Sequence, residues 1–269
     1  MAKNKIKRPS IAKFLGEHVK IWWELVKYRP FRKNYQPEAK GDKHPVLVIP
    51  GFLAGDFSTK SLRNFINKLG YRAYPWELGR NLGDIRQLND LLRKIETLSQ
   101  KHETKVSLVG WSLGGVYARQ LAKEKPELIR QVITMGSPFA GIREPNNAAF
   151  LFKLLNNRRE IEEKDQHWIE DIPAPAPVPT TAMYSKDDGI VPWEVCMEPE
   201  EDATHQNIEI LGVHLAMGHN PTVWVVVEDR LQYNADNWVT FDPATSISHK
   251  DVVFPGVQKA ASKQEPSYK

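Results

Sequence analysis

Short apolar runs alternate with segments of helical periodicity over most of this 269-residue chain. The runs are nearly continuous rather than alternating, which is typical of strands that are covered on both faces. They lie at 45–49, 71–76, 106–109, 131–135, 180–184 and 207–211. Helical segments between them include 58–69, 84–102 and 115–123. This alternation predicts an α/β fold in which a mostly parallel central sheet has helices on both faces.

The alternation is interrupted once, between residues 141 and 179. A partly apolar helical piece and a charged stretch lead there into the proline-rich segment 173–179. An insertion of about 40 residues between two core strands predicts a helical cap, placed after the strand that ends near Met135. The expected organisation is therefore a basic N-terminal extension, one α/β domain carrying the cap, and a C-terminal tail, at 1–40, 41–240 and 241–269.

Composition excludes several classes of protein. The single cysteine, Cys196, excludes an internal disulfide and a four-cysteine zinc site, so no metal is expected. A chain with so little cysteine fits a reducing compartment, and we expect a cytoplasmic location. The longest apolar runs, such as 223–227, are far shorter than the roughly 20 residues that span a bilayer. Charged residues recur near the start without a small-residue cleavage site, so no secretory signal peptide is expected.

The N-terminal segment is strongly basic. Residues 1–33 hold ten Lys or Arg against Glu17 and Glu24, a net charge of +8, while the whole chain carries +4. The rest of the chain is therefore at −4, which argues against nucleic-acid binding. Apolar residues recur at helical spacing over 10–26, with Ser10 placed to cap the helix.

Two interpretations of this helix remain open. In the favoured one, the apolar stripe docks on the nearby domain and the two glutamates face solvent with the lysines. In the other, a basic amphipathic helix lies on an anionic membrane or closes over a pocket. The second interpretation would give the protein a peripheral membrane contact through residues 1–33. No oligomeric state follows from the sequence.

The pattern Gly-x-Ser-x-Gly occurs at 110–114, directly after a predicted strand and before a predicted helix. This setting is typical of a nucleophile elbow, a sharp turn that makes the serine hydroxyl project while glycines let neighbouring backbone approach closely. A serine hydroxyl becomes nucleophilic when a histidine takes its proton and a carboxylate orients that histidine. The pattern therefore predicts Ser112 as a nucleophile.

The partners of such a serine follow it along the chain, first the acid and then the histidine. Asp187 and Asp188 both follow the strand predicted at 180–184, and Asp188 is favoured because it directly precedes a tight turn. His214 lies just past the strand predicted at 207–211 and is favoured over His219. The latter stands beside Asn-Pro, which is typical of a helix N-cap and first turn.

A tetrahedral intermediate also needs two backbone N–H donors for its oxyanion. One is expected from Leu113, directly after the nucleophile. The other is expected from the loop after the first strand, where Gly51 permits a turn and Phe52 or Leu53 offers its N–H, with Phe52 preferred. Apolar side chains expected near the substrate are Leu53, Trp111, Phe139 and Phe150.

These motifs resemble the α/β-hydrolase superfamily, in its bacterial esterase and lipase branch. The matching segments are VLVIPGFLAGD (46–56), YPWELGRNLGD (74–84), VGWSLGG (109–115), ITMGSPFAG (133–141), YSKDDGIVPW (184–193) and LGVHLAMGHNP (211–221). One departure is Pro50, where many members have histidine before the glycine. The resemblance implies an α/β-hydrolase fold and hydrolysis of carboxylic esters by Ser112, Asp188 and His214 through an acyl-enzyme, with no metal or organic cofactor.

The expected substrate is a small-molecule ester or lipid with an apolar acyl or alcohol part. A carboxylesterase is the favoured activity. A triacylglycerol lipase with a mobile lid and an acyltransferase that uses the same three residues remain alternatives.

Overall fold

The computed structural model describes residues 9–37, 41–140, 168, 171–244 and 252–255. Within them, six strands form one sheet in the order β2-β1-β3-β4-β5-β6, and every neighbouring pair is parallel. The strands are β1 (Pro45–Ile49), β2 (Arg72–Tyr74), β3 (Val106–Trp111), β4 (Ile129–Met135), β5 (Thr180–Tyr184) and β6 (His205–Glu209). The predicted α/β fold is confirmed.

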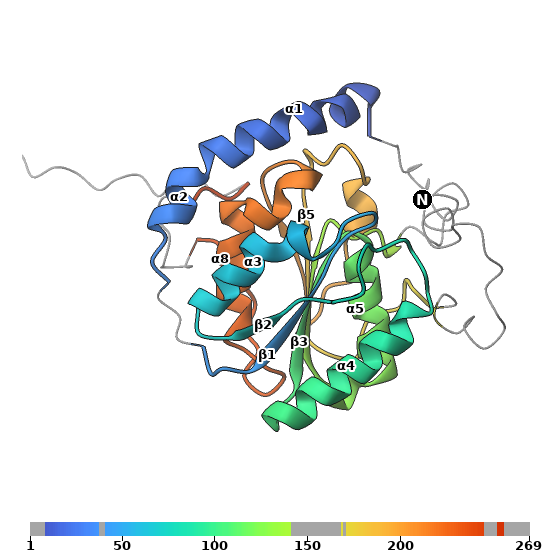
Figure 1. Cartoon of the computed structure of the whole chain (residues 1–269). Helices are drawn as coiled ribbons and strands as arrows, with labels where there is room; N and C mark the ends of the chain where they lie inside the picture. The colour runs from blue at the N-terminus through green and yellow to red at the C-terminus, as the bar shows by residue number, and fades with distance from the viewer. Residues whose placement is uncertain (1–8, 38–40, 141–167, 169–170, 245–251, 256–269) are drawn as a thin grey trace, which may run out of the picture.

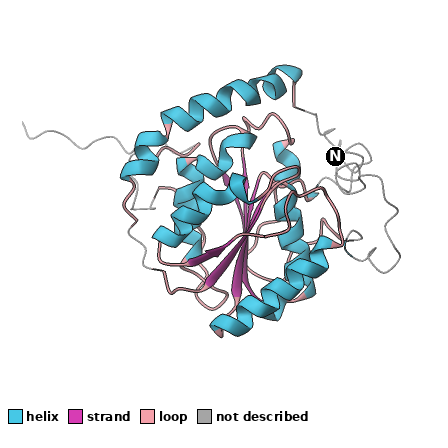
Figure 2. Cartoon of the chain, in the orientation of Figure 1, coloured by secondary structure: helices cyan, strands magenta, loops and turns pink. Residues whose placement is uncertain are grey.

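Helices cover both faces of the sheet (Figure 1; Figure 2). On one face α3 (Asp56–Lys68) and α8 (Pro221–Leu231) pack on Val46 and Val48 of β1. On the other face α4 (Gln87–His102) and α5 (Leu113–Glu124) pack on Leu47 and Ile49. All five residues of β1 are buried, which explains why its sequence is apolar throughout rather than alternating. Short 3-10 helices in the described connections are η1 (Pro126–Leu128), η4 (Trp193–Cys196) and η5 (His214–His219).

The strand order reverses beside β1. The chain leaves β1 for β2 on one side and then crosses back to β3 on the other. In open parallel sheets, ligands bind at the carboxyl ends of the strands where the order reverses in this way. The loops that follow β1 and β3 are therefore the place where a functional site is expected.

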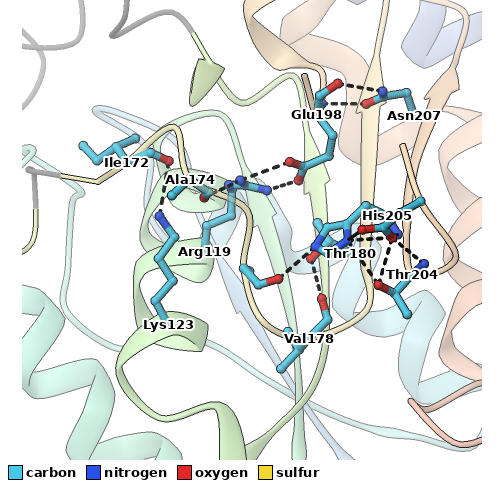
Figure 3. A network of polar contacts seen from close by, with 12 residues as sticks. Arg119, Lys123, Ile172, Ala174, Val178, Thr180, Glu198, Thr204, His205 and Asn207 are labelled. Carbon is cyan, nitrogen blue, oxygen red and sulfur yellow. Dashed lines mark hydrogen bonds and ion pairs between the residues drawn. The ribbon is translucent and has the colours of Figure 1, made fainter. Parts of the chain in front are cut away.

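A buried polar network holds the chain segment before β5 against α5 (Figure 3). Arg119 of α5 is fully buried and forms a two-pronged ion pair with Glu198, and it also donates to the carbonyl of Ala174 at 2.9 Å. From β6, the Nε2 atom of His205 lies 2.8 Å from the carbonyl oxygen of Ala176. Asn207 binds both backbone groups of Glu198 through its side-chain amide. These contacts fix the helix that directly follows Ser112.

The N-terminal extension forms α1 (Ile11–Lys27) and α2 (Arg29–Asn34), with Ser10 capping α1 as predicted. Figure 1 shows α1 in dark blue along the outer edge of the molecule. Its favoured orientation from the sequence is wrong, because Glu17 and Glu24 are buried. Of the apolar residues that were expected to dock, Leu25 is partly buried, and the others are between 47% and 78% exposed: Ile11, Phe14, Leu15, Trp22 and Val26. Val19 and Trp23 of the same helix are exposed as well. The side of α1 that carries these two carboxylates faces the protein, because they accept hydrogen bonds there from backbone N–H groups that are described below.

The predicted cap at 141–179 lies outside the described residues except for 168 and 171–179, and so does most of the C-terminal tail. The proposed boundaries of the domain therefore stay a prediction. In the part of the chain that the structure describes, no helix combines the length and the apolar character needed to cross a membrane.

Candidate active site

Ser112 occupies the sharp turn between β3 and α5. Its backbone has φ +53° and ψ −122°, a left-handed conformation that a residue with a side chain adopts only under strain. The neighbouring strand fixes this turn, since the Ser112 N–H donates to the carbonyl of Met135 at 2.8 Å. Strain of this kind is typical of a nucleophile elbow.

The glycines of the motif are required by close backbone contacts. A Cβ atom at Gly110 would lie 2.3 Å from the Cα atom of Gly115, and one at Gly114 would lie 2.3 Å from the carbonyl oxygen of Ile49. Both distances are far below any allowed contact, so any larger residue would push α5 away from the sheet. The glycines therefore hold the helix that starts at Leu113 directly against the strand ends.

Asp188 and His214 are joined by a hydrogen bond of 2.6 Å between Oδ2 and Nδ1. The other carboxylate oxygen, Oδ1, accepts from the N–H groups of Ile190 and Val191 at 2.8 and 2.7 Å. Both oxygens of Asp188 are thus held in place. Asp187, the alternative acid, is exposed, and its N–H donates to the side chain of Ser185.

His214 lies close to the turn that carries Ser112. Its carbonyl accepts from the indole N–H of Trp111 at 3.2 Å. Met135, whose carbonyl accepts from the Ser112 N–H, is followed by Gly136. A Cβ atom at Gly136 would lie 3.0 Å from Nδ1 of His214, so the His214 ring packs against this segment. The three predicted catalytic residues are therefore brought to one end of the sheet, after β3, β5 and β6 respectively.

Charged neighbours set the protonation of His214. Burial by itself would lower its pKa, but the charge and hydrogen bond of Asp188, together with the charge of Glu17, outweigh burial and raise the pKa above its ordinary value. His219, the alternative histidine, is at the other end of η5. Burial and then the positive charge of Arg32 lower the pKa of His219 to about 4, and its ring binds no carboxylate among the described residues.

The loop after β1, where one of the two oxyanion donors is expected, lies beside Ser112. A Cβ atom at Gly51 would be 3.1 Å from Cβ of Ser112, so this loop runs directly beside the serine. The N–H of Leu53 is already used, because it donates to the carbonyl of Asn81 at 2.7 Å. The N–H of Phe52 has no partner among the described residues. Leu113 begins α5, so its N–H has no partner within the helix.

Asn81, in the segment YPWELGRNLGD, holds this loop. Its side-chain amide donates to the carbonyl of Pro50 at 2.9 Å, and its own N–H donates to the carbonyl of Ala54 at 2.8 Å. Asn81 is fully buried. Together with the hydrogen bond that Leu53 donates to the Asn81 carbonyl, these contacts position the loop next to Ser112. They give a structural reason for the resemblance in the segment 74–84.

The expected substrate residues differ in their surroundings. Leu53 is exposed on the loop after β1, and Trp111 is buried and hydrogen-bonded to the His214 carbonyl. Phe139 is fully buried in the core, with the Arg119 guanidinium 3.8 Å from its ring centre, and its expected place beside the substrate stays a prediction. Phe150 lies outside the described residues. Across the described ranges, no cluster of three or more His, Cys, Asp or Glu could hold a metal ion.

A family model described as palmitoyl protein thioesterase matches residues 45–186, which is more than half of the chain. The chain belongs to the palmitoyl protein thioesterase family. The match includes β1, the loop after it, and the Ser112 turn, and it ends two residues before Asp188. No curated protein sequence matches the chain significantly.

Solved structures with the same fold include several lipases. Lipase B of Aspergillus fumigatus is 19% identical to this chain, with a TM-score of 0.52. The match covers 75% of this thioesterase-family chain but only 56% of the lipase, so the chain spans little more than half the length of that protein. A structure from work on the metagenome-derived lipolytic enzymes LipS and LipT is 15% identical with a TM-score of 0.55, over 72% and 94%. A monoacylglycerol lipase of Paleococcus ferrophilus is 15% identical with a TM-score of 0.52, over 72% and 95%.

At such low identities the likeness shows the fold alone, which is that of the α/β-hydrolases. Family and fold together make this protein a hydrolase of the lipase, esterase and thioesterase type. The esterase and lipase resemblance seen in the sequence is confirmed at the level of the superfamily.

In this thioesterase-family protein two carboxylates of α1, Glu17 and Glu24, are buried beside the site, although the sequence predicted that both face solvent. Glu17 of α1 accepts hydrogen bonds through Oε1 from the N–H groups of Gly189 and His214, at 2.7 and 3.0 Å. Its Oε2 atom accepts from the N–H of Leu215 at 3.0 Å. One carboxylate from outside the family match therefore ties together the loops that carry Asp188 and His214.

Glu24, two turns further along α1, extends this support by accepting from the N–H of Val213 at 3.0 Å. Burial raises the pKa of Glu24, although the Val213 hydrogen bond opposes that shift. The signal in the sequence was the spacing of seven residues between Glu17 and Glu24, which places both on one face of a helix.

Proposed function

We propose that this protein hydrolyses carboxylic esters with an apolar acyl or alcohol part, using Ser112 as nucleophile, His214 as general base and Asp188 as its orienting acid. The observation that carries the proposal is the 2.6 Å hydrogen bond between Asp188 and His214, at the same sheet end as the strained turn of Ser112. A buried, oriented histidine beside a projecting serine is the arrangement that nucleophilic acyl transfer needs.

In the proposed reaction, the Ser112 hydroxyl attacks the ester carbonyl while His214 takes its proton at Nε2. Asp188 holds the proton of His214 on Nδ1 and stabilises the imidazolium that forms. The N–H groups of Phe52 and Leu113 bind the oxyanion. The leaving alcohol takes the proton from His214, and a water molecule, activated by the same histidine, then releases the acid from the acyl-enzyme.

Nitrophenyl esters of increasing acyl length test the proposal. The Ser112→Ala variant should lose nearly all turnover, and a fall of about 10⁶ has precedent in another serine hydrolase. Ser99→Ala, on the far end of α4, is the matched control and should keep wild-type activity. Retention of most activity by Ser112→Ala, with its fold intact by circular dichroism, would refute the role of the serine.

A thioester is the second candidate substrate, and the family match favours it. The chemistry would be the same except that a thiol leaves instead of an alcohol. An acyl-CoA thioester and an oxygen ester with the same acyl chain should be compared on wild type and Ser112→Ala. A higher serine-dependent kcat/KM for the thioester would favour this candidate, and a higher value for the oxygen ester would favour the first.

The other activities can be separated in the same assays. A peak at long acyl chains that rises with emulsified lipid would favour a lipase, and a peak at short chains would favour a carboxylesterase. Acyl transfer to an added alcohol or thiol in preference to water would identify an acyltransferase. The cytoplasmic location expected from the cysteine content is part of the proposal, and cell fractionation would test it.

A further inference from the structure

The outer side of α1 is an apolar surface. Seven large apolar residues of this helix are exposed, and we call them the α1 outer face: Ile11, Phe14, Leu15, Val19, Trp22, Trp23 and Val26. Two of them are adjacent tryptophans, 71% and 65% exposed. Scattered exposed apolar residues are normal on a protein, but a continuous stripe along one helix marks an interaction surface.

Positive charge borders this face. Lys13, Lys20 and Lys27 recur every seven residues, so they follow one edge of α1, and all three are exposed. Lys13 Nζ donates to the carbonyl of Lys186 at 2.6 Å, so the basic border of this face rests on Lys20 and Lys27. The two acidic residues of the segment, Glu17 and Glu24, are buried on the opposite side. The described residues 9–33 therefore present an apolar and basic surface to solvent, with six Lys or Arg and no exposed carboxylate.

The inner side of α1 fixes the direction of the outer face. Glu17 binds three backbone N–H groups and Glu24 binds a fourth. Rolling the helix to bury its apolar stripe would take both carboxylates away from these groups and leave the N–H groups buried without partners, which is strongly unfavourable. The outward apolar face is thus a built feature of the fold rather than one of several orientations.

We propose that α1 lies flat on an anionic lipid surface, with the α1 outer face in the boundary between headgroups and acyl chains. Interfacial helices combine an apolar face that carries Trp and Leu with a lysine-rich border. Tryptophan favours the membrane–water interface, and lysines at the edge can reach the negatively charged headgroups. A second copy of the chain is the less favoured occupant, because its face has the same basic border and offers no exposed carboxylate to these lysines.

This placement goes beyond the proposed hydrolysis and would bring the site to the lipid. A helix with its side chains is about 10–12 Å across. The inner side of α1 contacts the backbone of His214 and the loop of Asp188. The proposed catalytic residues would therefore stand about one helix diameter from the bilayer surface.

Sedimentation of the full-length protein with vesicles tests the proposal. Vesicles of phosphatidylcholine alone are compared with equal parts of phosphatidylcholine and phosphatidylglycerol, at low and high salt. We use point variants rather than a deletion of α1, because a deletion also removes Glu17. The variants are Trp22→Ser/Trp23→Ser for the apolar face and Lys20→Glu/Lys27→Glu for the basic edge.

Matched controls lie away from α1. Val239→Ser/Val253→Ser removes two other exposed apolar residues. Lys101→Glu/Lys105→Glu makes the same change in charge next to the amino end of β3, at the opposite end of the sheet from His214. Ser112→Ala shows whether binding depends on the proposed nucleophile.

We expect wild type, both controls and Ser112→Ala to sediment with the anionic vesicles, and more weakly at high salt. The tryptophan variant should bind at least about tenfold more weakly, because it removes two large apolar side chains from the interface. The lysine variant should lose most of the salt-sensitive binding. Both variants should keep wild-type turnover of a water-soluble short ester, since neither touches Glu17.

Three results would overturn the proposal. The first is failure of wild type to bind anionic vesicles, and the second is equal binding by wild type and the tryptophan variant. The third is a wild-type dimer in analytical ultracentrifugation that the tryptophan variant dissociates, without vesicle binding by either. Loss of ester turnover in Ser112→Ala leaves these readouts unchanged, so the lipid contact and the proposed chemistry can fail separately.

Discussion

Replacing Glu17 by glutamine removes one charge while keeping the shape of the side chain. The amide oxygen can still accept from the N–H groups of Gly189 and His214. The amide nitrogen, however, takes the place of Oε2 and faces the N–H of Leu215, so that a donor stands opposite a donor. The substitution therefore breaks one of three hydrogen bonds to a charged acceptor and weakens the other two.

The structure sets the size of the effect. A hydrogen bond to a charged group contributes about 1.5–3 kcal/mol, so Glu17→Gln should lower the free energy of unfolding by about that much. For a protein of this size, each kcal/mol corresponds to about 2–4 °C in Tm, and a fall of roughly 3–12 °C is expected. Glu124→Gln, at the exposed end of α5, is the control and should leave Tm unchanged.

The pH profile separates a role at the site from a structural one. The charge of Glu17 helps to raise the pKa of His214, so the variant should have a His214 of lower pKa. Because the neutral histidine is the base, activity rises as pH passes upward through this pKa, and the rising limb of kcat/KM should move to lower pH. A lower Tm with an unmoved acid limb would refute the electrostatic role of Glu17, and an unchanged Tm would refute the contacts themselves.

Three further predictions follow from contacts described above. Asp188→Asn should reduce kcat by about 10⁴, the loss known for the equivalent change in a serine protease, and should abolish the raised pKa of His214 in a pH–rate profile. Asn81→Ala should loosen the loop of Phe52 and lower kcat with little change in KM, by less than the roughly 10²–10³ lost with a direct oxyanion donor; a change in KM alone would contradict this. Arg119→Met should cost about 3–5 kcal/mol in urea unfolding because it leaves Glu198 buried without its cation, and Arg119→Met/Glu198→Met should recover most of that loss.

The sheet and the serine turn could be predicted from the sequence because their signals are local. The strands at the centre of the sheet are buried and mainly apolar, and the turn of Ser112 needs its glycines within five residues. The edge strand β6 was predicted at 207–211 and lies at His205–Glu209. Among the described strands β6 pairs on one side only. His205 is buried, but Gln206 and Asn207 after it are polar and partly exposed, so the apolar pattern placed the strand two residues too late.

The orientation of α1 could not be predicted, for a physical reason. The rule that an apolar stripe faces the core assumes that charged residues gain nothing from burial. Here Glu17 is buried because Gly189 and His214, almost two hundred residues away along the chain, present unpaired N–H groups to it. The contact of Phe139 could not be predicted for a similar reason, since nothing near it in sequence reveals the buried guanidinium that covers its ring.

The four hydrogen bonds that Glu17 and Glu24 of α1 accept also decide how this protein can be dissected. A fragment that starts at β1 would contain every strand, every glycine of the serine turn, and the whole family match. It would nevertheless lack the carboxylates that accept from the N–H groups of Gly189, Val213, His214 and Leu215, and these groups would be left to solvent. In such a fragment Ser112 should still react slowly with a small electrophile, but His214 should no longer be held in position. The shortest fragment that folds and the shortest fragment that is active should therefore differ in length.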